Sequence, residues 1–316
     1  MTNIFQRIFY LALLLLALAA CSDKPVEPLR IATNIWPGYE PLYLARDLGE
    51  FEGTPVGMVE MPSNTEGIRA FRNGAVEAAA LTLDEVLMLQ QDGMDVRILF
   101  VMDVSDGADV VMARPGIATL KDLAGKRVGV EGSALGAYML GRALDAAGLH
   151  PADVKIVPLT VDQHEQAYLS GAVDAVVTFE PVRTRLLHAG AHVVFDSSRI
   201  PDEIFDVLVT RGDILERRPQ DFQRLKENWF RAVAYLHTHP DDAAQRIAKR
   251  IGISGKEYLD SLNGLKIPDR AENTRLLEGA APAILAPARR LADAMQQMKL
   301  LHASVNPAAL LGQKGD

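Results

Sequence analysis

Short apolar runs alternate with stretches of helical periodicity from Leu29 to Thr210. The apolar runs have the length and the β-branched content of buried strands, and the stretches between them repeat apolar side chains every three or four positions. This alternation is typical of parallel βαβ units and predicts an α/β fold. The predicted strands are 29–33, 56–61, 77–81, 96–101, 108–113, 127–130, 155–158, 175–178, 192–195 and 206–210.

Several expected helices begin with a residue pair that can satisfy both ends of a first helical turn. The pairs are Ser63-x-x-Glu66, Thr82-x-x-Glu85, Thr119-x-x-Asp122 and Thr160-x-x-Gln163. After Asp213 the pattern is helical only, and it predicts helices over 219–237, 240–251, 254–262 and 287–301.

The chain also resembles itself. The segment 73–78 (NGAVEA) leads into an apolar strand, and 170–175 (SGAVDA) does the same further along; 30–38 likewise parallels 126–136. In each repeat a glycine would end a helix in the left-handed conformation. We therefore predict two lobes of similar build. The first comprises 29–113 plus 205–316 and the second 114–204, with chain crossings near 114–116 and 200–205.

The N-terminus has the composition of an export signal. Arg7 precedes an apolar run over 8–20, which is too short to span a bilayer. The run ends in Leu-Ala-Ala before Cys21, the only cysteine of the chain, and so resembles the lipobox of bacterial lipoproteins. The resemblance implies a signal peptide over 1–20, attachment of lipid, palmitate included, at Cys21, and a polar tether over 21–28. Ser22 favours the outer membrane in a Gram-negative host. A plain secretory leader is the alternative.

Charge excludes one class of partner. The chain carries a formal net charge of −8, whereas nucleic-acid binding depends on Lys and Arg that neutralise phosphates. We expect no nucleic-acid partner.

In open parallel sheets, ligands bind beyond the carboxyl ends of the strands, where loops lead into helices. The loops at these positions carry hydroxyl, amide, aromatic and carboxylate side chains. The candidate ligand-binding residues are Asn34, Trp36, Tyr39, Ser63, Asn64, Thr82, Asp84, Asp106, Asp109, Glu131, Ser133, Phe179 and Glu180.

A family resemblance enters at these loops. The run 36–45 (WPGYEPLYLA), the run 120–132 (LKDLAGKRVGVEG) and the strand followed by Phe179-Glu180-Pro181 are similar to the nitrate/sulfonate/taurine-type solute-binding proteins of ABC importers and to their thiamine-precursor-binding relatives. The segment from His239-Pro240 to Gly252-Ile253-Ser254 is similar too. The resemblance implies the type II periplasmic-binding-protein fold: two lobes, a hinge and a ligand cleft. It also implies an ABC permease of the inner membrane as partner, and we expect a periplasmic monomer.

Charge also bears on the ligand. The candidate loops contain no Arg or Lys but contain several carboxylates, Asp84, Asp109 and Glu180 among them. A buried anion needs donors, and buried carboxylates need a counter-charge. A small nitrogenous solute, amine-bearing or heteroaromatic, is therefore favoured, and a sulfonate-type solute, such as an amino-sulfonate, stays open. Trp36, Tyr39 and Phe179 could stack on a flat ring or contact a cation.

Two alternatives stay open. Thiamine-pyrimidine-synthase enzymes share the implied fold, but they carry a cysteine-rich iron motif, and this chain has no cysteine beyond Cys21. Phosphate-binding and dinucleotide-binding glycine motifs and a G-x-S-x-G elbow are missing as well. We therefore expect no enzyme, cofactor or metal. A ligand-sensing lipoprotein that acts on a membrane receptor would have the same fold and cleft.

Overall fold

The structure is a computed structural model and describes residues 27–53 and 56–312. The predicted signal peptide, Cys21 and most of the tether lie outside the described residues. The strands are β1 (Leu29–Thr33), β2 (Val56–Glu60), β3 (Ala78–Thr82), β4 (Val96–Ser105), β5 (Val110–Ala113), β6 (Arg127–Val130), β7 (Lys155–Pro158), β8 (Ala175–Thr178), β9 (His192–Asp196), β10 (Phe205–Arg211) and β11 (Leu265–Lys266).

Helices cover both sheets. The longer ones are α2 (Glu40–Asp47), α3 (Asn64–Arg72), α4 (Leu83–Gln91), α5 (Ala134–Asp145), α6 (Val161–Leu169), α7 (Val182–His188), α8 (Gly212–Arg217), α9 (Pro219–Thr238), α10 (Pro240–Ile251), α11 (Gly255–Ser261), α12 (Arg270–Leu277) and α13 (Leu285–Gln297). Short 3-10 turns include η1 (Pro37–Tyr39) and η4 (Ser197–Arg199). Among these elements α8, α12 and β11 were not predicted from the sequence.

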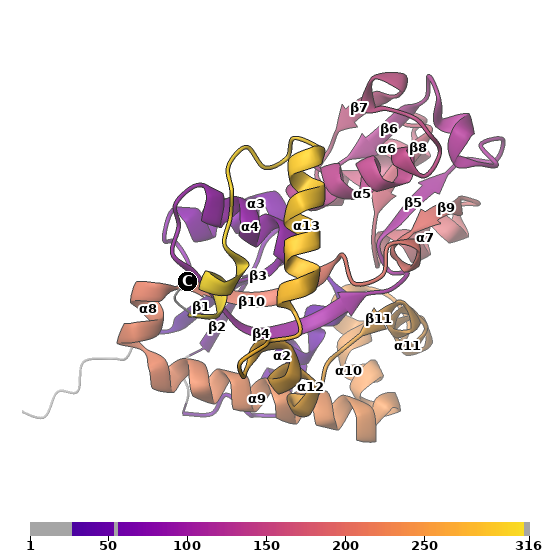
Figure 1. The fold of residues 1–316 in the computed structure, drawn as a ribbon. Coiled ribbons are helices and arrows are strands. Elements are labelled where there is room, and N and C mark those ends of the chain that lie inside the picture. The colour runs from indigo at the N-terminus through magenta and orange to yellow at the C-terminus, as the bar shows by residue number, and fades with distance from the viewer. Residues whose placement is uncertain (1–26, 54–55, 313–316) are drawn as a thin grey trace, which may run out of the picture.

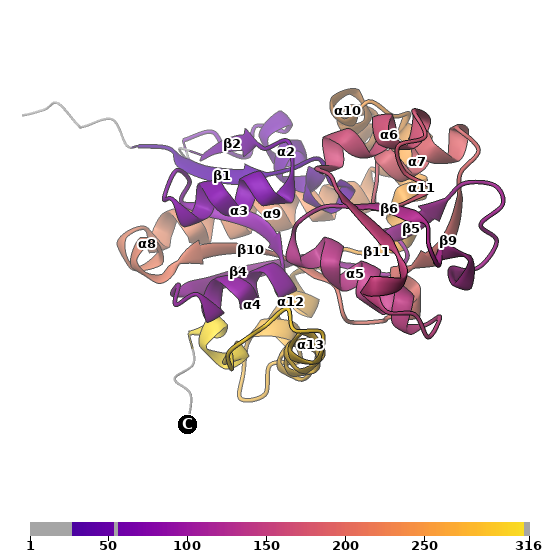
Figure 2. The ribbon, with the colours of Figure 1, turned by 90° about the horizontal axis from the view of Figure 1, so that it is seen from above.

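The strands form two separate sheets, ordered β11-β4-β10-β3-β1-β2 and β7-β6-β8-β5-β9. In each sheet a pair of parallel strands lies beside an antiparallel one: β1 and β3 beside β10, and β6 and β8 beside β5. Figures 1 and 2 show the two sheets in two bodies side by side, each with its own helices. The predicted two-lobe α/β fold is confirmed.

The internal sequence repeat has a physical counterpart. In the first lobe, the Arg30 backbone N–H and guanidinium both donate to Glu77. In the second, Arg127 donates in the same way to Asp174, with an Nη2–Oδ1 distance of 2.7 Å. Each pair ties a first strand to the loop that enters its parallel neighbour, which explains why an acid follows "GAV" in both repeats.

The chain crosses between the sheets twice. The first crossing lies between β4 and β5, at 106–109, because β5 pairs with β8 and β9. We had placed 110–113 in the first lobe, and the strand pairing corrects that boundary by one strand. The second crossing, at 197–204, coincides with the predicted stretch. Ser105 and Ser197 hydrogen-bond across the crossings at 2.8 Å.

The C-terminal helices pack on the first lobe. Ala232 and Leu236 of α9 and Ile247 of α10 form a second apolar core with α2. At the end of α13, Met298 reaches the second lobe, where a Cβ on Gly141 of α5 would lie 1.9 Å from its Cε. In the described part of the chain, no helix combines the length and the apolar character that crossing a bilayer requires.

Candidate functional site

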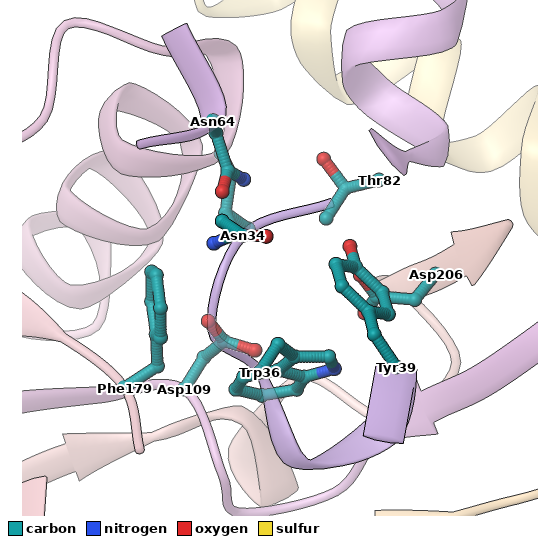
Figure 3. Close-up of a pocket in the computed structure, with 9 residues that line it drawn as sticks. Asn34, Trp36, Tyr39, Asn64, Thr82, Asp109, Phe179 and Asp206 are labelled. Carbon is teal, nitrogen blue, oxygen red and sulfur yellow. The ribbon is translucent and has the colours of Figure 1, made fainter. Parts of the chain in front are cut away.

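The loops that follow β1, β3 and β8 meet between the two lobes around a small hollow (Figure 3). Its lining residues are Asn34, Trp36, Tyr39, Asn64, Thr82, Asp109, Leu135, Phe179 and Asp206. The free space inside is about 10 Å³, which is the size of one water. Most solutes can therefore enter only when the lobes part.

Aromatic side chains from both lobes meet at this hollow. Trp36 of the first lobe packs edge-on against Phe179 of the second, with ring centroids 5.4 Å apart. The Trp36 Nε1–H donates to Asp103 at 2.9 Å. Gly38 is required beneath this bond, because a Cβ there would lie 1.8 Å from Asp103 Oδ2. The absence of a side chain at Gly38 thus lets the turn approach the carboxylate of Asp103 closely.

Asp103 and Asp206 are a carboxyl pair that the sequence analysis did not single out as ligand-binding residues. They are register partners on β4 and β10, and both are buried. The Tyr39 hydroxyl donates to Asp206. Burial is the main cause that raises the pKa of both carboxyls, and the charges of Asp103 and Asp109 raise the pKa of Asp206 further. In the sequence, the one indication of this pair is that each acid stands within an otherwise apolar strand.

Asp109 of the first crossing and Asn64 of the first lobe, both predicted, line the hollow. Burial raises the pKa of Asp109 to about 7. Asn64 Nδ2 donates to Glu85 at 3.4 Å, so the amide nitrogen is directed away from Asp109. Glu85 and its neighbour Asp84 are also buried, and burial raises the pKa of both. The hollow is therefore surrounded by carboxyl groups.

Other predicted residues contribute to helix starts. Thr82 N–H donates to the carboxylate of Glu85 in the first turn of α4. The hydroxyls of Ser63 and Ser133 accept from backbone N–H groups of α3 and α5, at 3.3 and 3.2 Å. These side chains shape the ends of the loops that line the hollow.

Glu131 bridges the lobes. It follows β6 in the second lobe, and its Oε1 accepts from the backbone N–H and the hydroxyl of Thr65 at the start of α3, at 2.9 and 2.8 Å. Glu131 is 5% exposed. Its carboxylate is thus bound to the opposite lobe in this closed arrangement.

Two predicted carboxylates are held elsewhere. Glu180 is buried, but it accepts from Arg183 and from the Thr184 N–H in the first turns of α7. It does not line the hollow described above. Asp106 lies at the first crossing and pairs with Lys266 at 2.8 Å. Both therefore have structural partners in the described part of the chain.

A second hollow continues from the first past Leu135 and Phe179 into the second lobe. Its wall includes His164 of α6, which was not predicted. His164 Nδ1 lies 3.1 Å from Thr178 Oγ1, and burial lowers the pKa of the imidazole to about 4. The ring is therefore neutral at physiological pH.

A wider groove of about 470 Å³ opens outside the hollows. Met61 and Pro62 of the first lobe and Val161 and Val182 of the second form its walls. Arg185 is the one basic residue on this groove, and the lining of the two hollows, over the residues described, includes no Lys or Arg. Within 27–53 and 56–312, no three His, Cys, Asp or Glu side chains are grouped to hold a metal ion.

Curated relatives share part of the sequence. A protein of Brucella abortus (strain 2308), described provisionally as a binding protein, is 26% identical over 57% of this chain and 60% of its own length. A protein of Bacillus subtilis (strain 168), described provisionally as an aliphatic-sulfonate-binding protein, is 27% identical over 72% of this chain and 70% of its own. The chain thus spans about 60% of the length of the Brucella relative.

Solved structures share the fold. The alkanesulfonate-binding protein of Xanthomonas axonopodis pv. citri bound to MOPS has a TM-score of 0.75 at 18% identity, and covers 89% of this chain and 96% of its own. The desulfurization enzyme DSZB has a TM-score of 0.65 at 19% identity, over 90% and 96%. The fold therefore occurs in binding proteins and in at least one enzyme.

The model of the NMT1-like family matches residues 22–252, from the predicted tether through α10. This match and the relatives above confirm the resemblance to the nitrate/sulfonate/taurine group that the loop motifs carry. The chain belongs to the NMT1-like family.

Proposed function

We propose that this chain is the extracytoplasmic solute-binding component of an ABC importer. The observation that carries the proposal is a polar and aromatic hollow enclosed between two lobes, which over residues 56–312 are joined in sequence by the crossings at 106–109 and 197–204. Such a hinge lets the lobes part, admit a small solute and close over it. The binding proteins among the relatives support the same role.

The location and partners form part of this proposal. The signal-like run over 8–20 and the single Cys21 support export and a lipid anchor, and Ser22 supports the outer membrane in a Gram-negative host. The mature monomer would deliver its solute to a permease of the inner membrane. The relatives described as aliphatic-sulfonate-binding and alkanesulfonate-binding proteins support the role in capturing a solute for import.

We also propose that the chain is not an enzyme, although DSZB shares its fold. The hydroxyl of Ser133, which lines the second hollow, is an N-cap that accepts from Gly136. The imidazole of His164 lies beside the hydroxyl of Thr178, but burial lowers the imidazole pKa to about 4, so the ring is a weak general base for that hydroxyl. Binding alone accounts for the groups present.

A thermal-shift screen of the mature chain from residue 22 tests the binding role. The panel contains amines, pyrimidines, sulfonates and nitrate. A solute at 100 times its Kd should add about 2.7 kcal/mol to the free energy of unfolding. Failure of every class to stabilise the protein would contradict the role. For the importer assignment, a permease and an ATPase should be encoded beside the gene; a sensor kinase there would contradict it.

A further inference from the structure

Two acceptor atoms at the hollow have no hydrogen-bond partner. Asp109 Oδ2 and Asn64 Oδ1 are both unbonded, although their residues are only 3% and 7% exposed. Asn64 belongs to the first lobe and Asp109 to the first crossing between the lobes, and both line the same space. A buried acceptor without a donor is costly and rare in native proteins. The pair therefore marks a place that a donor group fills.

Three of the donors around this space are bonded to carboxylates, and a fourth, the hydroxyl of Thr82, has no partner. The indole N–H of Trp36 donates to Asp103, and the hydroxyl of Tyr39 donates to Asp206. The amide nitrogen of Asn64 donates to Glu85. These donors serve neither the two free acceptors nor an incoming anion. A ligand that donates matches the space, whereas a sulfonate brings only further acceptors.

Charge favours the same kind of ligand. Asp84, Asp103 and Asp206 lie close enough to Asp109 for their charges to interact, and Glu85 interacts with Asp84. The lining of both hollows, across the described residues, offers no Lys or Arg to balance them. Closing the lobes over an uncompensated carboxylate is unfavourable. A cation inside the cleft removes that cost.

We infer that the cleft binds the protonated nitrogen of an organic solute, a primary ammonium or an amidinium, between Asp109 Oδ2 and Asn64 Oδ1. The inference rests on the proposed binding role and names its ligand class. The N–H groups donate to both acceptors, so the nitrogen joins the first lobe to the first crossing. The apolar part of the solute lies against Trp36 and Phe179, whose ring faces also attract cations.

The pH dependence of binding follows from Asp109. Because its pKa is about 7, Asp109 is protonated at lower pH, and it must lose this proton before it can pair with a cation. Affinity for an amine that stays charged should rise from pH 5 to 7 and then level. Tyr39, Asp84, Glu85, Asp103, Glu131 and Asp206 also face this region, and His164 stays neutral above pH 5. The contribution of Asp109 is therefore measured by how the slope of log affinity against pH differs between wild type and Asp109→Asn.

Calorimetry with matched probes tests the inference. Benzylammonium and benzamidinium should bind at least tenfold more tightly than benzenesulfonate. Asp109→Asn should weaken the better cation at least tenfold and lower the slope of log affinity against pH by about one proton. The same change at Asp213, whose side chain is 63% exposed on α8, should alter neither.

The outcomes separate the two proposals. Asp109→Asn should keep or raise the Tm of the unliganded protein, because it removes a buried charge, so a loss of binding would not reflect unfolding. Tight binding of benzenesulfonate, with neither cation bound, would overturn the cation inference and leave the binding role intact. Equal cation binding in wild type and Asp109→Asn would also overturn it. If neither cation binds and benzenesulfonate does not bind either, the cation inference fails, and the wider thermal-shift screen decides the binding role separately.

Discussion

The Glu131 bridge makes lobe closure testable with one substitution. Glu131 contacts Thr65 of the opposite lobe only when the lobes are together. Replacing it with alanine removes the bridge and one carboxylate of the second hollow, and leaves every residue that lines the first hollow in place. We expect Glu131→Ala to shift the protein toward the open form and to weaken every ligand that requires closure.

The size of the effect follows from the two bonds. A hydrogen bond to a charged group contributes about 1.5–3 kcal/mol net. Both Thr65 bonds end on one oxygen, so we count them together as about 2 kcal/mol, which corresponds to a loss of roughly thirtyfold in Kd. Glu131→Gln keeps a neutral acceptor and should fall between wild type and alanine.

Calorimetry with the tightest ligand of the screen measures the change, and small-angle scattering of the unliganded protein should show a larger radius of gyration. Glu66→Ala is the matched control. Glu66 lies next to Thr65 in the first turn of α3, but its side chain pairs with Arg69 at the surface. Surface pairs of this kind contribute about 0–1 kcal/mol. Wild-type affinity in Glu131→Ala would refute the closure argument.

Three further changes have defined outcomes. Gly38→Ala should abolish ligand binding in calorimetry while circular dichroism stays native, because its Cβ displaces the carboxylate below Trp36; retained affinity would contradict this. Arg250→Leu leaves the buried Glu40 unpaired and should lower the free energy of urea unfolding by about 3–5 kcal/mol, whereas loss of the exposed pair of Arg246 should change it by less than about 1 kcal/mol. Between pH 4 and 7 the unliganded protein binds more protons when folded than when unfolded, because the pKa of Asp109 is about 7 in the folded state. The urea midpoint of unfolding should therefore fall as pH rises. A rising midpoint would show that the carboxylates are not buried in solution.

The sequence allowed the strands and the loops of the first lobe to be predicted, because apolar runs and caps are local patterns. Asp103 and Asp206 could not be paired from sequence, since their meeting depends on the register of two strands far apart in the chain. Glu180 looked like a cleft residue because it follows a strand, but its own helix binds it. His164 lies on a helix whose orientation no local pattern specifies.

The contact of Met298 with Gly141 connects the lobes at a third place in the chain, beside the Glu131–Thr65 bridge and the Trp36–Phe179 contact. Any rotation that admits a solute must slide a flexible thioether along α5, and methionine tolerates such repacking better than a branched residue would. The extent of opening, and with it the largest solute that can enter, therefore depends partly on a residue far from the ligand.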